Sequence, residues 1–486
     1  MRSHGRKSKR TSSKENNPTM GRHRITTAAI LVGLMSSAAA LTVVASPGWA
    51  MSLEDALALA YQSNPQLVAA RAQLRATDEG VPQALGQWKP QVTLSGSIGK
   101  GSLKQHYDEI PNSTTRYDGL TPSSTAVQLT QQVYSGWTNP SVDRAEATVE
   151  SQRATLTATE QTVLLQVVQA YMGVLQSQQV VDANRSNLQV LTQQRNAARE
   201  RADLRQGTRT DLAQADTRLA SAQASLEQAQ ANLRSAGATF EQVVGQKPVQ
   251  LRLPPPPPGV NETRDGIVAT ASAANPNVVA AEKSMKAAEA AIDVATGQLL
   301  PSVTVQALAQ RSYETGIGLG FTQNNAQITA NVNVPLYEAG IVRSQVRQAK
   351  ETYAQTRAER DNVRTQAIAA AQQAVDQLDG ARARVVAQRQ SVDAGRVALD
   401  GVRAEFGAGQ RTLYDILQAQ QDLFNAQVAL TQAEVDSLTA SYQVLQAVGR
   451  LTARDLKLPV KLYDPEAHYN DVRGRWFGLG GSVDKD

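Results

Sequence analysis

The sequence contains an internal duplication, and this feature constrains the fold more than any other. Asn64-Pro65 opens a helical stretch followed by an alternating strand, and the same order returns at Asn275-Pro276, 211 positions later. Further along, the segment around Asp211 matches the one around Asp415 at an offset of 204. Each half predicts a helix, two short strands and two very long helices, so neither half can bury its apolar faces as a closed domain. The duplication therefore predicts a mainly α-helical, internally symmetric object.

The first fifty residues predict a secretory signal peptide. Arg22 and Arg24 precede an apolar run from Ala28 to Ala45, and Gly48-Trp49-Ala50 has the small side chains of a cleavage site, so we expect cleavage after Ala50. Residues 1–50 hold eight of the 49 basic and one of the 44 acidic side chains, which leaves 41 basic against 43 acidic and a net charge of −2. This balance removes the basic character that would favour nucleic-acid binding, so we expect no nucleic-acid partner.

The residue types that catalysis or metal binding would need are scarce. The sequence has no Cys, which excludes disulfides, thiolate metal sites and the acylated N-terminal Cys of a lipoprotein. His106 and His468 lie outside any metal-ligand spacing, and no H-E-x-x-H, G-x-S-x-G or Walker motif occurs. Gly316–Gly320 lacks the strand and helix that flank a phosphate-binding loop. We expect no catalytic residue, no metal and no cofactor.

Four segments with period-two alternation predict membrane β-strands, at residues 91–100, 124–134, 302–310 and 326–336. Each has about the 9–11 residues that cross a bilayer at a tilt, and we expect the two strands of each half to form a hairpin. Ordinary hairpins of a soluble domain remain the alternative. Aromatic side chains gather at the helix side of the strands, which favours the membrane interpretation because such residues lie at lipid interfaces. They are Trp88, Tyr134, Trp137 and Tyr337.

Two stretches, after Trp137 and after Glu338, predict helices of about 100 Å at 1.5 Å per residue. In the first, apolar residues recur at intervals of seven, which predicts a face that packs against neighbouring helices. Val149, Leu156 and Val163 belong to this face. An isolated coiled-coil rod would explain the helices but would leave the strands without a role.

The two predicted helix-to-helix turns carry the most specific short patterns. Gly207 and Gly409 are placed to end one helix and let the chain reverse. Asp211 and Asp415 each follow a Thr by three positions, which is the spacing of a capping box at the start of the next helix. Helix capping is the simplest interpretation of these residues.

The signal peptide, the duplicated plan, the Asn-Pro openings and the segment GQRTLYDILQAQ at residues 409–420 closely resemble the TolC family of outer-membrane exit ducts. The resemblance covers essentially the whole chain after residue 50. It implies a homotrimer in outer-membrane lipid, in which each protomer adds four strands to a twelve-stranded β-barrel and its helices to a long periplasmic α-helical barrel. The residues themselves require some oligomer, because four strands cannot close and an open edge in lipid leaves backbone groups unsatisfied. The number three comes from the resemblance alone.

The resemblance also implies a function and a division of the chain. The expected function is a passive duct for type I protein secretion and/or multidrug efflux, joined through a periplasmic adaptor (membrane fusion) protein to an inner-membrane ABC or RND pump. The missing lipid anchor favours the type I or multipurpose branch. An exported structural or adhesive coiled-coil envelope protein is the alternative, and solubility without detergent would distinguish it.

We expect two loops outside the cell, at Gly101–Pro122 and Arg311–Asn325. The expected division is a signal peptide at 1–50, a first repeat at 51–250, a Pro-rich linker in the equatorial region at 251–265, a second repeat at 266–450, and a tail near the equatorial belt at 451–486.

A periplasmic gate near the two turns is a further implication of the resemblance. Related proteins hold this end closed with Arg, Tyr and Asp residues, and the matching positions here are Thr210, Asp211, Arg411 and Asp415. Two positions depart from the family pattern, since Phe406 stands where a Tyr hydroxyl would donate and Gln418 where some relatives have a second acidic ring. We expect Arg411 and Asp415 to gather around the threefold axis.

Overall fold

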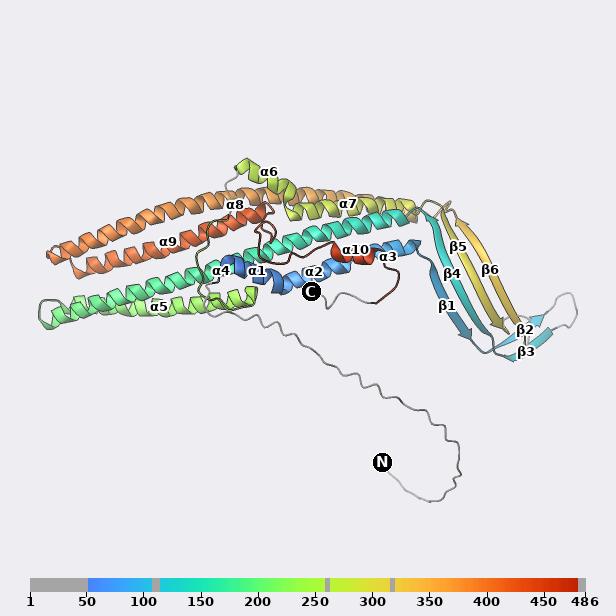
Figure 1. Cartoon of the computed structure of the whole chain (residues 1–486), viewed down its shortest axis with the longest axis horizontal. Coiled ribbons are helices and arrows are strands. Elements are labelled where there is room, and N and C mark those ends of the chain that lie inside the picture. Colours follow the sequence, from blue (N-terminus) through green and yellow to red (C-terminus); the bar gives the residue numbers. More distant parts are fainter. Residues whose placement is uncertain (1–50, 107–113, 258–262, 315–319, 480–486) are drawn as a thin grey trace, which may run out of the picture. The chain divides into compact units, whose positions relative to one another are not determined.

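The computed structural model describes residues 51–106, 114–257, 263–314 and 320–479, all of which belong to one compact unit, Trp49–Asp486. The expected signal peptide, part of the Pro-rich linker, most of the glycine-rich segment at 316–320 and the end of the tail lie outside the described residues. Long helices and a small antiparallel sheet dominate this unit (Figure 1). Among the described helices, none is both long enough and apolar enough to cross a membrane.

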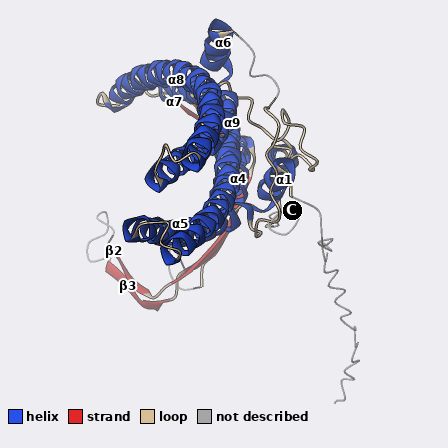
Figure 2. Ribbon diagram, turned by 90° about the vertical axis from the view of Figure 1, so that its left-hand side faces the viewer, coloured by secondary structure: helices blue, strands red, loops and turns tan. Residues whose placement is uncertain are grey.

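Two helical hairpins form most of the unit. α4 (Thr138–Asp203) turns into α5 (Arg209–Val244), and α8 (Ile341–Gly407) turns into α9 (Leu413–Ala447). α4 has 66 residues and α8 has 67, so each is about 100 Å long. α9 contacts α4, and the four helices follow one curved layer in the order α8, α9, α4, α5 (Figure 2). Towards the sheet, α7 (Pro276–Gly297) lies between α4 and α8.

Shorter helices pack along the hairpins. The first of them are α1 (Leu53–Ser63), α2 (Pro65–Asp78) and α3 (Gly80–Leu85), which contact α4, with a 3-10 turn, η1, at Gly86–Trp88. In the second half, α6 (Arg264–Ala274) contacts α8, and α10 (Ala467–Arg473) of the C-terminal tail contacts α2 and α3.

The Asn-Pro pairs explain how both halves begin. Asn64 and Asn275 each accept a hydrogen bond at 2.9 Å from a backbone N–H in the first turn of the next helix, where Pro takes the first helical position. Each Asn side chain also donates at 3.0 Å to the end of the last long helix of its own half, to Val243 O and Ala447 O respectively. One residue type therefore caps one helix and ties it to another in both repeats, as the duplication predicts.

The largest apolar core lies where α1, α4, α5, α8 and α9 meet. Tyr171 and Phe240 are fully buried there, with ring centroids 6.4 Å apart. The Tyr171 hydroxyl donates at 2.7 Å to Arg252 O, which fixes the start of the linker between the halves. Burial raises the pKa of Tyr171 above its usual value.

The face of α4 with seven-residue spacing is buried, as the sequence predicts, but it packs on two different partners. Val163 belongs to the large core. Val149 and Leu156 form a second cluster with Leu74 of α2 and Val81 of α3. The part of this face that contains Val149 and Leu156 therefore stabilises the single chain, because it packs against α2 and α3 of the same chain.

The sheet has the order β1 (Gln91–Ile98), β4 (Ser123–Ser135), β5 (Ser302–Tyr313), β6 (Thr322–Asn333), and all its neighbours are antiparallel. β1 pairs with β4 and β5 with β6, as expected, and the β4–β5 pair joins the two halves. The register places apolar side chains in one row across the sheet and polar side chains in the next, so the two faces differ in polarity. The apolar row is Val92, Leu129, Ala307 and Ile328, and the polar row is Gln91, Thr130, Gln306 and Thr329.

Three strand details differ from the sequence prediction. β5 extends to Tyr313 and β6 begins at Thr322, so both strands reach into the segment expected as the second loop, Arg311–Asn325. The register shifts between Gln132 and Tyr134, so Tyr134 pairs with Val303 on the apolar face, where simple alternation places Val133. The segment expected as the first loop contains a separate ribbon of β2 (Gly101–His106) and β3 (Thr114–Leu120). The sequences GSLKQH and TTRYDGL lack an apolar side of period two, so alternation alone does not reveal this ribbon.

Candidate functional site at the helix tips

The two turns between the long helices have the same backbone structure. In the α4–α5 turn, the N–H groups of Arg205 and Gln206 donate to Ala202 O and Arg201 O, at 3.1 and 2.8 Å. In the α8–α9 turn, the N–H groups of the two residues 204 positions later donate to the equivalent carbonyls, at 3.0 and 2.9 Å. We call residues 204–208 and 408–412 the tips. Their common hydrogen bonds satisfy the last carbonyls of α4 and α8.

The left-handed residue of each tip is Arg205 (φ 60°) in the first and Gly409 (φ 77°) in the second. Gly409 is therefore the helix-ending glycine that the sequence predicts. Gly207 has another role, because a Cβ there would lie 3.2 Å from Arg201 Cβ and 3.4 Å from Ala202 N. Gly207 lets the chain pass close to the end of α4, whereas Arg205 adopts a conformation that costs a residue with a side chain about 1–2 kcal/mol.

The predicted capping boxes are confirmed at both tips. Thr208 Oγ1 accepts a hydrogen bond from the Asp211 N–H at 3.0 Å, and Asp211 Oδ2 accepts one from the Thr208 N–H at 3.3 Å. At the second tip, Asp415 Oδ2 accepts from the Thr412 N–H at 2.9 Å and from its hydroxyl at 2.8 Å. These donors hold the pKa of Asp415 below its usual value. Asp211 and Asp415 are both partly exposed.

Arg411 has a carboxylate partner that the sequence reasoning missed. Its Nε lies 2.7 Å from Glu405 Oε2, and about half of each side chain is exposed. The Glu405 hydrogen bond and charge raise the pKa of Arg411, and the Asp415 charge adds a smaller effect through space. Within one chain, Arg411 therefore binds the end of α8, while Asp415 caps α9.

Phe406 and Gln418, the two positions that depart from the family pattern, make polar contacts between helices. The guanidinium carbon of Arg201 lies 4.8 Å from the centre of the Phe406 ring, which links α4 to α8 by a cation–π contact. The side-chain oxygen of Gln418 accepts from Arg218 Nη2 at 3.3 Å, which links α9 to α5. Phe406 thus offers a cation its ring face in place of a hydroxyl. Thr210 is exposed in the first turn of α5.

A cavity of about 290 Å³ lies between the two tips, lined by residues of both hairpins that include Arg201, Asp211, Arg403 and Phe406. Below it, Leu417 of α9 packs with Leu191 of α4 and Ala222 of α5. The contacts at the tips are few and exposed, and such pairs contribute about 0–1 kcal/mol each. The hairpins are therefore held firmly by buried apolar contacts away from the tips and weakly at the tips themselves.

The predicted interface aromatics lie at the helix-side ends of the strands. Trp88 Nε1 donates to Asn139 Oδ1 at 3.2 Å, which joins η1 to the start of α4, where Trp137 is half-buried. Tyr134 on β4 is 46% exposed, and Tyr337, which follows β6, is 82% exposed. The rings of Tyr134 and Tyr337 are therefore exposed where the strands join the helices.

Comparison with known proteins assigns the duplicated plan to a family. The sequence profile of the family described as outer membrane efflux protein matches residues 56–246 and 267–450, once in each half. The outer membrane efflux protein BepC of Brucella suis biovar 1 is 38% identical over 430 residues, which cover 88% of this chain and 92% of BepC. The outer membrane protein TolC of Vibrio cholerae is 24% identical over 426 residues, covering 86% and 95%.

A solved structure shows that the fold is shared as well. The outer membrane protein VceC of Vibrio cholerae superposes with a TM-score of 0.70 at 20% identity, over 82% of this chain and 96% of that one.

Proposed function

The chain belongs to the outer membrane efflux protein family, and from that premise we propose that it works as a homotrimeric duct fed by an inner-membrane pump. As a member it is an outer-membrane efflux and secretion channel that extends into the periplasm. Family membership alone does not give the trimer, the gate or the partners of this chain, so we argue them from its residues.

The observation that carries the proposal is the open sheet. Among the described residues, neither β1 nor β6 has a strand partner on its outer edge. Val92 and Ile328, on the apolar face of these edges, are 65% and 79% exposed. In lipid each unpaired backbone group costs several kcal/mol, so the edges must pair with other copies. β1 and β6 run in opposite directions, and an antiparallel join between neighbouring copies repeats the pairing already present inside the sheet.

The helices support the same assembly. The curved layer of α8, α9, α4 and α5 ends in α8 on one side and α5 on the other (Figure 2). Val386 and Val397 on α8 are 58% and 75% exposed in the single chain. We assign this flank of α8 to contact with the next copy, since three curved layers joined edge to edge would enclose a continuous channel.

The tips form the proposed periplasmic gate. In a ring of three copies, Arg411 can form an ion pair either with Glu405 of its own chain or with a carboxylate of a neighbouring copy. Each such pair is weak, but threefold repetition in a confined ring couples them. The gate residues are Thr210, Asp211, Phe406, Arg411, Asp415 and Gln418, and Glu405 joins them as the partner of Arg411. A periplasmic adaptor that contacts the tips would open the gate, and an ABC or RND pump in the inner membrane would supply the energy.

Engineered cysteines test the assembly, because the natural sequence has no Cys. Ser95→Cys on β1 would be combined in turn with cysteines at Gln327, Thr329 and Asn331 on the same polar face of β6. We expect at least one pair to form covalent dimers and trimers in outer membranes on mild oxidation. Ser95→Cys with Ile328→Cys is the matched control, because Ile328 points to the opposite face. A stable monomer in native mass spectrometry, with no cross-link from any pair, would contradict the trimer.

Deletion of the gene tests the cargo. Loss of secreted proteins with unchanged drug susceptibility supports type I secretion. Increased susceptibility with an unchanged set of secreted proteins supports efflux, the activity for which BepC is named.

A further inference from the structure

The described part of the C-terminal tail ends in an exposed apolar segment that the proposed function does not use. Trp476, Phe477 and Leu479 follow α10 and are 60%, 89% and 106% exposed. Gly478 between them has a φ of 123°, which turns the chain there. Exposing two aromatic rings and a Leu in succession to water is unfavourable. We call residues 476–479 the tail segment.

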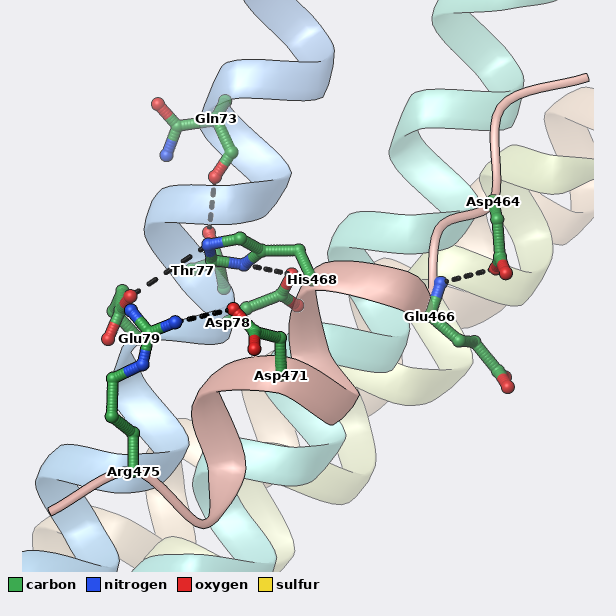
Figure 3. Close-up of polar contacts among 9 residues, drawn as sticks. All are labelled: Gln73, Thr77, Asp78, Glu79, Asp464, Glu466, His468, Asp471 and Arg475. Atoms are coloured by element: carbon green, nitrogen blue, oxygen red, sulfur yellow. Dashed lines mark hydrogen bonds and ion pairs between the residues drawn. The ribbon is translucent and has the colours of Figure 1, made fainter. Parts of the chain in front are cut away.

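Polar contacts fix the helix that carries the tail segment. His468 Nδ1 lies 3.2 Å from Asp78 Oδ2 and its Nε2 lies 3.8 Å from Glu79 Oε1, so the ring sits between two carboxylates at the end of α2 (Figure 3). Asp78 is fully buried, and burial raises its pKa. Arg475 Nη2 binds Asp471 Oδ2 at 2.6 Å at the other end of α10.

A second set of contacts joins α10 to α4. Glu146 Oε1 accepts hydrogen bonds from the Tyr469 hydroxyl at 3.1 Å and from Arg473 Nη2 at 2.9 Å. Val472 is buried at the centre of this contact. Because α10 contacts both α2 and α4, it fixes the point from which the tail segment leaves.

These contacts bring the tail segment to the start of the sheet. Lys89 Nζ donates to Arg475 O at 2.8 Å and lies 5.3 Å from the centre of the Trp476 ring. Lys89 follows the aromatic Trp88 and comes two positions before the first residue of β1, Gln91. Trp476 therefore lies beside Lys89, close to the level where β1 begins.

We propose that the tail segment is an interfacial anchor that inserts Trp476, Phe477 and Leu479 into the periplasmic leaflet of the outer membrane. Its ligand is the phospholipid interface. Aromatic rings prefer this depth, the Leu side chain reaches the acyl chains, and Lys89, Arg473 and Arg475 beside them suit lipid phosphates. This inference rests on the proposed placement of the sheet in the bilayer. The tail segment would attach the chain to the periplasmic leaflet beside the barrel, although the sequence has no Cys that could carry a lipid anchor.

Fluorescent labelling at single cysteines tests the anchor in trimers reconstituted into phosphatidylethanolamine and phosphatidylglycerol nanodiscs. Phe477→Cys would carry an environment-sensitive dye, and lipids with a nitroxide near the headgroup or deep in the acyl chain would quench it. Two positions that are similarly exposed in the single chain provide controls: Ile328→Cys on the apolar face of β6 and Leu204→Cys at the tip of α4, which are 79% and 68% exposed. We expect Phe477→Cys to lose most of its emission to the shallow nitroxide, Ile328→Cys to the deep one, and Leu204→Cys to neither.

The outcomes separate this inference from the proposed function. If Ile328→Cys is quenched and Phe477→Cys behaves like Leu204→Cys, the anchor is refuted while the membrane sheet stands. If Ile328→Cys is also unquenched, the proposed placement of the sheet fails. A blue-shifted dye at Phe477→Cys that no lipid quenches would mean that protein covers the segment, which also refutes the anchor.

The contacts of α10 supply a second measurement. We expect His468→Gln, added to Phe477→Cys, to release α10 and lose most of the shallow quenching, while the same change leaves the quenching of Ile328→Cys unaltered. Unchanged quenching at Phe477→Cys would show that the α10 contacts do not position the segment.

Discussion

Two glycines, one from each repeat, allow the backbone after β4 to lie directly against the end of α7. Gly136 follows β4, and Gly297 is the last residue of α7. A Cβ on Gly136 would lie 2.6 Å from Gly297 O, and a Cβ on Gly297 would lie 2.7 Å from Trp137 N and still closer to the Gly136 carbonyl. The atoms that obstruct a Cβ on Gly297 are all backbone, so no side-chain rotation can relieve the overlap there. We therefore expect Gly297→Ala to force the two repeats apart at this junction.

The size of the effect follows from two opposing terms. Replacing Gly by Ala in a helix normally stabilises it by about 1 kcal/mol. Overpacking costs about 1–3 kcal/mol, and contacts this short with backbone place Gly297→Ala at the upper end. The net expectation is a loss of about 2 kcal/mol in local stability. Gly401→Ala in α8 is the matched control, because a Cβ there meets nothing within 4 Å, and it should stabilise its helix by about 1 kcal/mol.

Hydrogen–deuterium exchange of the detergent-solubilised protein measures both variants. A loss of 2 kcal/mol corresponds to exchange faster by about 30-fold for amides at the end of α7 and the end of β4. Amides around Gly401 should exchange more slowly in the control variant. If Gly297→Ala exchanges as slowly as the natural protein in both segments, the glycine contact does not stabilise the junction and the reasoning is refuted.

Three further predictions concern the tips and the α10 contacts. Arg205→Gly should relieve the left-handed strain and slow amide exchange at its tip, whereas Gly409→Ala should introduce about 1–2 kcal/mol of strain and speed it at the other; equal exchange in both would contradict the assigned conformations. Arg411→Ser should raise single-channel conductance in planar bilayers, and Asp415→Asn should weaken block by multivalent cations from the periplasmic side; if both are electrically silent in an assembled trimer, these residues only shape the turn. Burial raises the pKa of Asp78, so the folded protein favours the neutral carboxyl group. The stability that this neutral group contributes is fully present below pH 3.8, the ordinary pKa, and is lost as pH rises through the raised pKa. Asp78→Asn should therefore flatten the fall of the unfolding free energy as pH rises above 3.8, and denaturant titrations at increasing pH would contradict this by showing the same pH dependence in both proteins.

Local patterns were predictable because a few neighbouring residues determine them. The capping boxes at Asp211 and Asp415 and the Asn-Pro starts follow from spacings of two or three residues, which the helix start itself imposes. The two faces of the sheet followed from period two, since a membrane strand needs one apolar side. The pairing of Tyr134 with Val303 was not predictable, because a bulge adds a residue without any signal in the alternation.

The contacts of the candidate site were less predictable because they cross turns or join different hairpins. Arg411 and Glu405 are six residues apart, a separation that brings side chains together only around a tight turn. Arg201 and Phe406 come from different repeats, and their contact depends on how α4 and α8 are arranged. Sequence reasoning named Phe406 from the family pattern, but its cation partner required the packing of the hairpins to be known.

The number of residues that separates equivalent positions of the two halves changes along the chain, and this change shows which segments must keep a fixed length. Gln91 and Ser302, which begin the first strand of each half, are 211 positions apart, but Thr138 and Ile341, which begin the long helices, are 203 apart. The difference therefore lies between the strands of each half, where the longer first segment contains β2 and β3. The helices that follow are matched, with 66 and 67 residues in α4 and α8 and 36 and 35 in α5 and α9. An excess of seven residues in one helix would displace its tip by about 10 Å and separate Arg201 from Phe406. Helix length is thus set by two tips that meet at one level, whereas the connection between strands carries no such constraint.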